Sequence, residues 1–141
     1  MTNGKAEAQA LLDAALPFAE QMLREFGEFL PYAGAVRQSG ETISIGGHDG
    51  REHPPSKDLI DLLEGGLRQG AVTGEYVVTA LVYDVRVTPP SASEPTDAIA
   101  AELEHRDGYA VTVFFPYALT NGQLILASPF ATAQSRSIYS R

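Results

Sequence analysis

The sequence predicts a single α+β domain in which two helices pack an antiparallel sheet, in the order α-β-β-α-β-β-β-β. Apolar residues recur every three or four positions in residues 6–30 and again in residues 56–70, which is the helical period. Shorter runs elsewhere alternate apolar and polar residues, as strands do. Because 141 residues is close to the commonest domain size, we expect one core in residues 1–130 and a flexible tail at residues 131–141.

The first helix carries a wide apolar stripe, so one of its faces should be buried. Pro17 lies inside the helix and lacks an N–H, so the helix should either kink there or restart with Pro17 in its first turn. Gly27 and Pro31 mark its exit. The stripe consists of Leu12, Leu16, Ala19, Leu23, Phe26 and Leu30.

A hairpin and a second helix follow. Residues 32–45 form two short runs around Ser39-Gly40, a dipeptide that tolerates the positive φ of a tight turn. Ser56 is placed to cap the second helix, and Gly70 is a natural stop. Gly65-Gly66 weakens this helix by roughly 1 kcal/mol per glycine relative to alanine, so its last turns should be its weakest.

The segment from residue 76 onward contains the remaining strands. The strand at residues 76–88 ends at Pro89-Pro90, and two tight-turn signals, Asp107-Gly108 and Asn121-Gly122, divide residues 96–130 into three more. A two-residue turn at Asp107-Gly108 would scatter the large apolar groups over both faces. A three-residue loop with Gly108 in a left-handed bulge gathers them on one face, and we prefer it. The resulting pairs are His105 with Tyr109, Leu103 with Val111, Ala101 with Val113, Ile99 with Phe115, Leu119 with Leu124, Tyr117 with Leu126 and Val113 with Phe130.

The opposite face of these strands is rich in small apolar residues, whereas a sheet with one face in water should alternate more cleanly. We therefore expect part of this face to be covered, either by a helix or by a second copy of the chain. The possible interface consists of Val78, Ala80, Val82, Ala98, Ala100 and Phe114.

Charge and composition exclude several classes of protein. The net charge is −8 and the 10 basic residues are scattered, which argues against binding to nucleic acid or to an anionic membrane. The chain has no cysteine, so disulfides and thiol chemistry are excluded. The longest nearly apolar run, residues 110–119, is about half the length that a bilayer-spanning helix needs. We expect a soluble, cytoplasmic protein.

Residues 46–55 are the best place to look for a metal site, because two of the three histidines lie there beside carboxylates. The candidate ligands are His48, Asp49 and His53. Their spacing misses the H-x-x-E-H zinc pattern by one residue, and the glycine and prolines of this loop exclude the helix that the pattern needs. We therefore predict a solvated loop without metal, and no cofactor elsewhere.

Catalytic chemistry is not predicted at the other polar positions. Glu102 and Glu104 share a strand face but do not flank a cleft, as the two carboxylates of a glycosidase do, and cross-strand pairs with Arg86 are expected instead. No serine lies in a G-x-S-x-G elbow.

The preferred register turns His105 toward the apolar side. A general base needs a partner within hydrogen-bond reach, and the sequence names none for this histidine. We expect a structural histidine that bonds a backbone carbonyl, or the hydroxyl of Tyr83 or Tyr117. No catalytic residue is therefore assigned.

Five phrases of the chain are distinctive: residues 29–36 (FLPYAGAV), 82–87 (VYDVRV), 97–100 (DAIA), 103–105 (LEH) and 115–117 (FPY). Together they resemble a group of small stand-alone bacterial proteins of uncharacterised function, over most of residues 10–130. The resemblance implies a bacterial single domain and no particular chemistry.

The leading expectation for function is a non-enzymatic protein-binding or self-associating domain, with a homodimer as one form. It depends on the apolar second face of the sheet. Two alternatives stay open: an acidic immunity or inhibitor protein that blocks a basic toxin or nuclease, and a small-molecule-binding domain that uses His48, His53 or His105.

Overall fold

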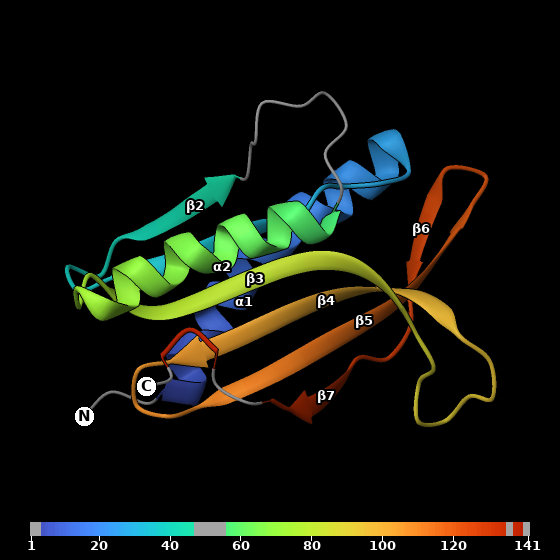
Figure 1. Ribbon diagram of the computed structural model, residues 1–141. Helices are drawn as coiled ribbons and strands as arrows, with labels where there is room; N and C mark the ends of the chain where they lie inside the picture. Colours follow the sequence, from blue (N-terminus) through green and yellow to red (C-terminus); the bar gives the residue numbers. More distant parts are fainter. Residues whose placement is uncertain (1–3, 47–55, 135–136, 140–141) are drawn as a thin grey trace.

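The computed structural model describes residues 4–46, 56–134 and 137–139, and confirms the α+β fold (Figure 1). The order of elements is the expected one, with a seventh strand added near the end. The elements are α1 (Gly4–Phe26), β1 (Tyr32–Arg37), β2 (Thr42–Gly46), α2 (Ser56–Val72), β3 (Tyr76–Val87), β4 (Thr96–His105), β5 (Ala110–Thr120), β6 (Gln123–Leu126) and β7 (Phe130–Ala133).

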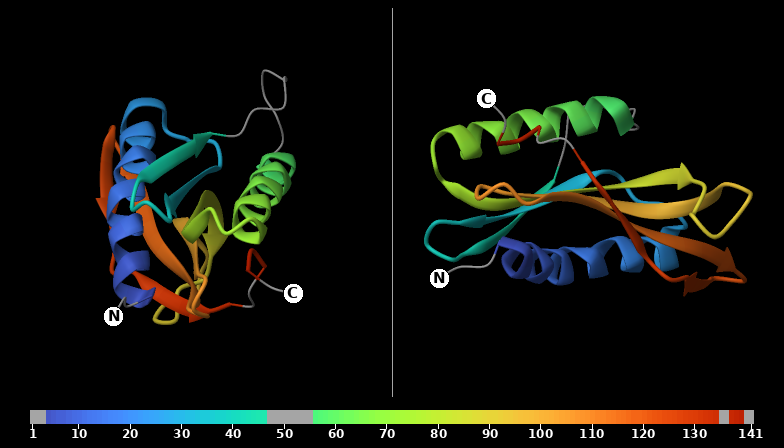
Figure 2. Two further views of the ribbon diagram at one scale, coloured as in Figure 1. Left: turned by 90° about the vertical axis from the view of Figure 1, so that its left-hand side faces the viewer. Right: turned by 90° about the horizontal axis from the view of Figure 1, so that it is seen from below.

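The strands form one antiparallel sheet in the order β2-β1-β3-β4-β5-β6, and β7 also pairs with β5. The two helices lie on opposite faces of this sheet (Figure 2). Helix α1 makes extensive contacts with β1, β3, β4 and β6. The extensive contacts of α2 with the sheet are to β1 and β3. Covering on both faces explains why Val77 to Val82 are all buried, in place of the alternation seen in a strand with one wet face.

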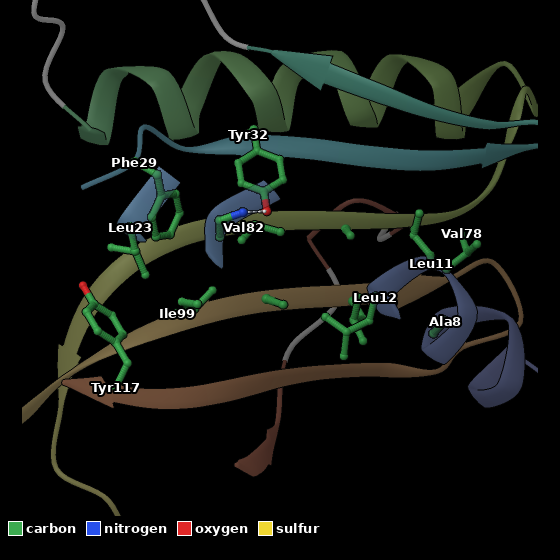
Figure 3. Packing of buried hydrophobic residues seen from close by; sticks show 14 residues of the cluster. Ala8, Leu11, Leu12, Leu23, Phe29, Tyr32, Val78, Val82, Ile99 and Tyr117 are labelled. Carbon is green, nitrogen blue, oxygen red and sulfur yellow. Dashed lines mark hydrogen bonds between the residues drawn. The ribbon is translucent and has the colours of Figure 1, made fainter. Parts of the chain in front are cut away.

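The larger core lies between α1 and the sheet (Figure 3). Leu23 of α1 lies near Val82 and Ile99 of the central strands, and Leu11 of α1 lies beside Val78 of β3. Each of these five side chains is at most 2 % exposed. At roughly 1.5–3 kcal/mol for each fully buried large aliphatic side chain, this contact is a main source of stability. The smaller core on the other face joins α2 to β1 and β3.

Pro17 is accommodated inside α1, and Tyr32 of β1 supports the helix beside it. The Tyr32 hydroxyl accepts a hydrogen bond from the Ala19 N–H (3.2 Å) and donates one to the Ala15 carbonyl (2.7 Å). These two groups are an i, i+4 pair, so a side chain from the sheet enters the hydrogen-bond ladder of the helix near the proline. Burial raises the pKa of Tyr32 to about 12. The hydroxyl therefore stays protonated and can act as donor and acceptor at once.

The predicted turns are confirmed. Gly27 and Gly40 have φ of 76° and 94° at the end of α1 and in the β1–β2 hairpin. The β4–β5 loop has three residues, with Gly108 at φ 116°, and the His105 N–H donates to the Tyr109 carbonyl at 2.8 Å. Asn121 and Gly122 both have positive φ, as a type I′ turn requires.

The expected register holds from Ile99 with Phe115 through Tyr117 with Leu126. The prediction for the last pair is wrong, because Phe130 lies opposite Phe114 and not Val113. The Ala127 N–H still donates to the Pro116 carbonyl, in register with the β5–β6 pairs. The register shifts by one residue between Ala127 and Phe130, where Pro129 has no N–H to offer. A shift of one residue reverses the face, so Phe130 lies on the α2 side of the sheet.

Candidate functional site

The prediction that six residues form one interface is wrong, because these residues are divided between the two faces of the sheet. Strand β3 pairs with β4 so that Val82 lies opposite Ala101 and Tyr83 opposite Ala100. The even-numbered residues of β3 therefore share a face with the odd-numbered residues of β4. Val78, Ala80 and Val82 are fully buried against α1, whereas Ala98, Ala100 and Phe114 lie on the α2 face.

On the α2 face, neither helix of the described residues lies over the half of the sheet formed by β4, β5 and β7 (Figure 1). Ala98 and Ala100 are nevertheless completely buried there. Phe114 is partly exposed and stacks on Phe130, with ring centroids 5.0 Å apart. Little of the predicted interface therefore faces solvent.

A more exposed apolar surface lies where α1 ends and the β5–β6 hairpin begins. Phe26 is 70 % exposed and Leu30 is 52 % exposed, while Leu119 and Leu126 are more than a third exposed. Leu119 and Leu126 share the α1 face of the sheet with Tyr117 and Leu124, which pack in the α1-side core. Helix α1 contacts β6, and the C-terminal end of α1 lies at the same end of the molecule as β6 (Figure 1). We call Phe26, Leu30, Leu119 and Leu126 the apolar end.

The sequence pattern places Phe26 and Leu30 in the buried stripe of the first helix, and this prediction is wrong. Helix α1 ends at Phe26, where Gly27 adopts a positive φ, so Leu30 no longer follows the helical period. The strand order then puts β6 at the border of the sheet, and no strand lies beyond it in the described chain. The signal that was available is the excess of leucines in the short β5–β6 hairpin.

A hollow lies between α1 and the β1–β2 hairpin, with a volume of about 230 Å³. The residues that line it are mainly apolar and include Phe18, which is half-exposed. The Phe18 ring packs edge-on against the Tyr32 ring, with the ring centroids 4.9 Å apart. Pockets for drug-sized ligands usually measure roughly 300–1,000 Å³. This hollow is smaller than that range, so it is a weak basis for the small-molecule alternative.

The expected pairing of Glu102 and Glu104 with Arg86 is wrong. Arg86 pairs with Asp97 across β3 and β4, at 3.2 Å. Glu102 accepts a hydrogen bond of 2.5 Å from the Tyr83 hydroxyl. Burial raises the pKa of Glu102 more than the bond from Tyr83 lowers it, and burial together with the Glu102 charge raises the pKa of Tyr83. This pair is a structural contact on the α2 face.

Glu104 is 1 % exposed, and its carboxylate holds the segment after β7. It accepts hydrogen bonds from the backbone N–H groups of Ser137, Ile138 and Tyr139. The expectation of a flexible tail is therefore wrong for the described residues after 130. The sequence pattern missed this contact because one isoleucine among polar residues has no periodicity. The position of the segment depends on the pairing of β7 with β5 and on the buried Glu104 carboxylate.

His105 is buried at 2 % exposure, as the preferred register predicts. Its partners differ from the expected ones. Its Nε2 lies 3.0 Å from the Glu7 carboxylate of α1, and its Nδ1 accepts from the Asp107 N–H at 3.1 Å. The histidine therefore ties the start of α1 to the β4–β5 loop, and sequence spacing could not reveal a partner 98 residues away.

The candidate metal ligands His48, Asp49 and His53 lie outside the described residues. Within residues 4–46, 56–134 and 137–139, no group of three or more histidine, aspartate or glutamate side chains is placed to hold a metal ion. In the same ranges, neither helix has the length and hydropathy needed to cross a membrane.

Comparison with protein-family models, with curated proteins and with solved structures gave no match. The contacts and exposure of this chain's own residues are therefore the basis for a proposal about its function.

Proposed function

We propose that this chain is a protein-binding domain that associates with a second copy of itself through the apolar end. The observation that carries the proposal is that four large apolar side chains are exposed at one end of the molecule, among them Phe26 at 70 % (Figure 1). Contiguous apolar patches of several hundred Å² are uncommon on monomeric soluble proteins and typically mark interaction sites. Aromatic residues at the centre of such a patch are also the usual anchors of an interface.

A second copy is the partner that fits both the patch and the charge. The patch has no charged member, so two copies related by a two-fold axis can bury it against itself without leaving a charge unpaired. The net charge of −8 disfavours contact between two copies through their charged surfaces, and an apolar contact reduces that penalty. Added salt should therefore strengthen the association, because it screens the remaining repulsion.

Sedimentation equilibrium between about 10 and 500 µM, a range chosen to bracket a dissociation constant on the order of 100 µM, tests the proposal. We expect a monomer–dimer equilibrium that the double variant Phe26→Glu/Leu119→Glu weakens by at least about 100-fold. Burial of each large apolar side chain contributes roughly 1.5–3 kcal/mol, and every 1.4 kcal/mol corresponds to about tenfold.

Val72→Glu is the matched control, because Val72 is 82 % exposed at the C-terminal end of α2, away from the apolar end (Figure 1). This variant should dimerise like the parent chain. Circular dichroism should show that both variants stay folded, since all substituted side chains are exposed. A parent chain that stays monomeric at 500 µM, or a double variant that dimerises normally, would refute the proposal.

A further inference from the structure

The buried carboxylate of Glu104 forms one half of a recognition site. Three consecutive backbone N–H groups converge on it, from Ser137 at 3.1 Å, Ile138 at 3.0 Å and Tyr139 at 3.3 Å. The Ser137 hydroxyl adds a fourth donor at 3.0 Å, and the Gln134 side-chain amide lies at 3.4 Å. Successive N–H groups that point at one anion form a nest, and here the peptide supplies the nest while the sheet supplies the anion.

An apolar socket forms the other half. Ile138 is 6 % exposed and enters the smaller core between α2 and the sheet. The Arg68 Nε on α2 donates to the Ser137 carbonyl at 2.8 Å, and the Tyr139 hydroxyl donates to the Tyr76 carbonyl at 3.1 Å. We call this smaller core the socket; its other buried members are Leu63, Leu67, Leu81 and Ala33.

The contacts have the composition of a peptide-binding site. One aliphatic side chain fills a pocket, and the main chain on both sides of it is read through its N–H and carbonyl groups. The carboxylate cannot be buried at low cost without such donors, because an ionised group that loses its hydrogen bonds in a low-dielectric site is strongly destabilised. An open site would therefore favour any segment that restores them.

We propose that Glu104, Arg68 and the Ile138 socket form a peptide-binding site. Residues 137–139 occupy it within one chain, and the same segment of a second copy occupies it when the chain's own segment is displaced. The ligand class is a short peptide that presents three consecutive N–H groups around an aliphatic residue. The site is on the α2 face, apart from the apolar end, and does not depend on dimerisation there.

The test uses the full chain with the substitution Ile138→Asp, which disfavours burial of the chain's own segment. A fluorescent peptide with the sequence of residues 134–141 is added, and its anisotropy is measured against protein concentration. We expect saturable binding to the I138D variant. Binding to the parent chain should be at least tenfold weaker, because the linked segment competes at a high effective concentration.

Three comparisons make the test specific. Ile125→Asp exchanges the same residue types on the exposed β6 strand, so this variant should bind the peptide as weakly as the parent chain. A peptide with aspartate in place of its isoleucine should not bind. Adding Glu104→Gln to I138D should weaken binding at least tenfold, because an amide offers one acceptor oxygen and turns an NH₂ group toward the peptide donors.

A folded I138D variant that does not bind the peptide up to 1 mM would overturn the proposal, as would equal binding to the parent chain. If I138D does not fold, Ile138→Ala serves in its place, because it empties the socket without burying a charge. Absence of peptide binding to this variant, or equal binding to the parent chain, would then overturn the proposal.

Discussion

Three glycines of α2 differ in the space around them. This difference decides whether a glycine-to-alanine substitution raises or lowers the free energy of unfolding. Gly65 and Gly66 are exposed, and a Cβ atom at either position would meet nothing within 4 Å. A Cβ at Gly70 would lie 2.3 Å from two ring carbons of Tyr76. Such a distance is far below ordinary van der Waals contact, so the ring would have to move.

The magnitudes follow from helix propensity and packing. Alanine is favoured over glycine by roughly 1 kcal/mol in a helix interior, so Gly65→Ala and Gly66→Ala should each stabilise the fold by about that amount. At Gly70 the same gain is opposed by an overpacking cost of about 1–3 kcal/mol, since Tyr76 packs in the smaller core. Gly70→Ala should therefore destabilise the fold by about 1 kcal/mol net.

Thermal unfolding at one fixed protein concentration measures these effects. An unfolding entropy of about 2.1 cal/mol/K per residue gives ~0.3 kcal/mol/K for 141 residues, so 1 kcal/mol corresponds to about 3 °C. We expect Gly65→Ala/Gly66→Ala to raise Tm by about 6 °C, since side chains at adjacent helix positions do not face each other, and Gly70→Ala to lower it by about 3 °C. The reasoning fails if Gly70→Ala is as stabilising as the other two, or if the double variant melts lower than the parent.

Two further predictions concern polar groups. Tyr32→Phe removes the hydroxyl that bridges the Ala15 carbonyl and the Ala19 N–H, and it should lower the free energy of unfolding in urea by about 1–2 kcal/mol; an unchanged value would show that the bridge contributes nothing. Burial raises the pKa of Glu102 above its ordinary value, so the folded state binds more protons than the unfolded state in the pH range between the two pKa values. The stability contributed by this group is lost as pH rises through the folded-state pKa. Glu102→Gln should therefore gain less stability than the parent chain when the pH is lowered from 7 toward 5, and equal gains in the two proteins would contradict this assignment.

The candidate interaction surfaces were less predictable than the fold, for reasons visible in single residues. Alternation along each strand correctly separated the two faces of β3 and of β4, but it could not say which face of one strand joins which face of the next. Val82 lies opposite Ala101, so the small apolar residues of β3 and β4 point to opposite sides of the sheet. The apolar end depends in the same way on the border position of β6, which is a property of strand order.

By itself, the sequence determined the elements and the local turns. The helical period set α1 and α2, and Gly108 and Asn121-Gly122 fixed the β4–β5–β6 register, because those turn geometries depend only on the residues within them. Tertiary structure alone decided that the helices cover opposite faces, that Glu7 meets His105, and that Glu104 captures residues 137–139. Each of these outcomes joins groups far apart in the chain, where no local periodicity records the distance between them, and only the packing of the whole sheet brings them together.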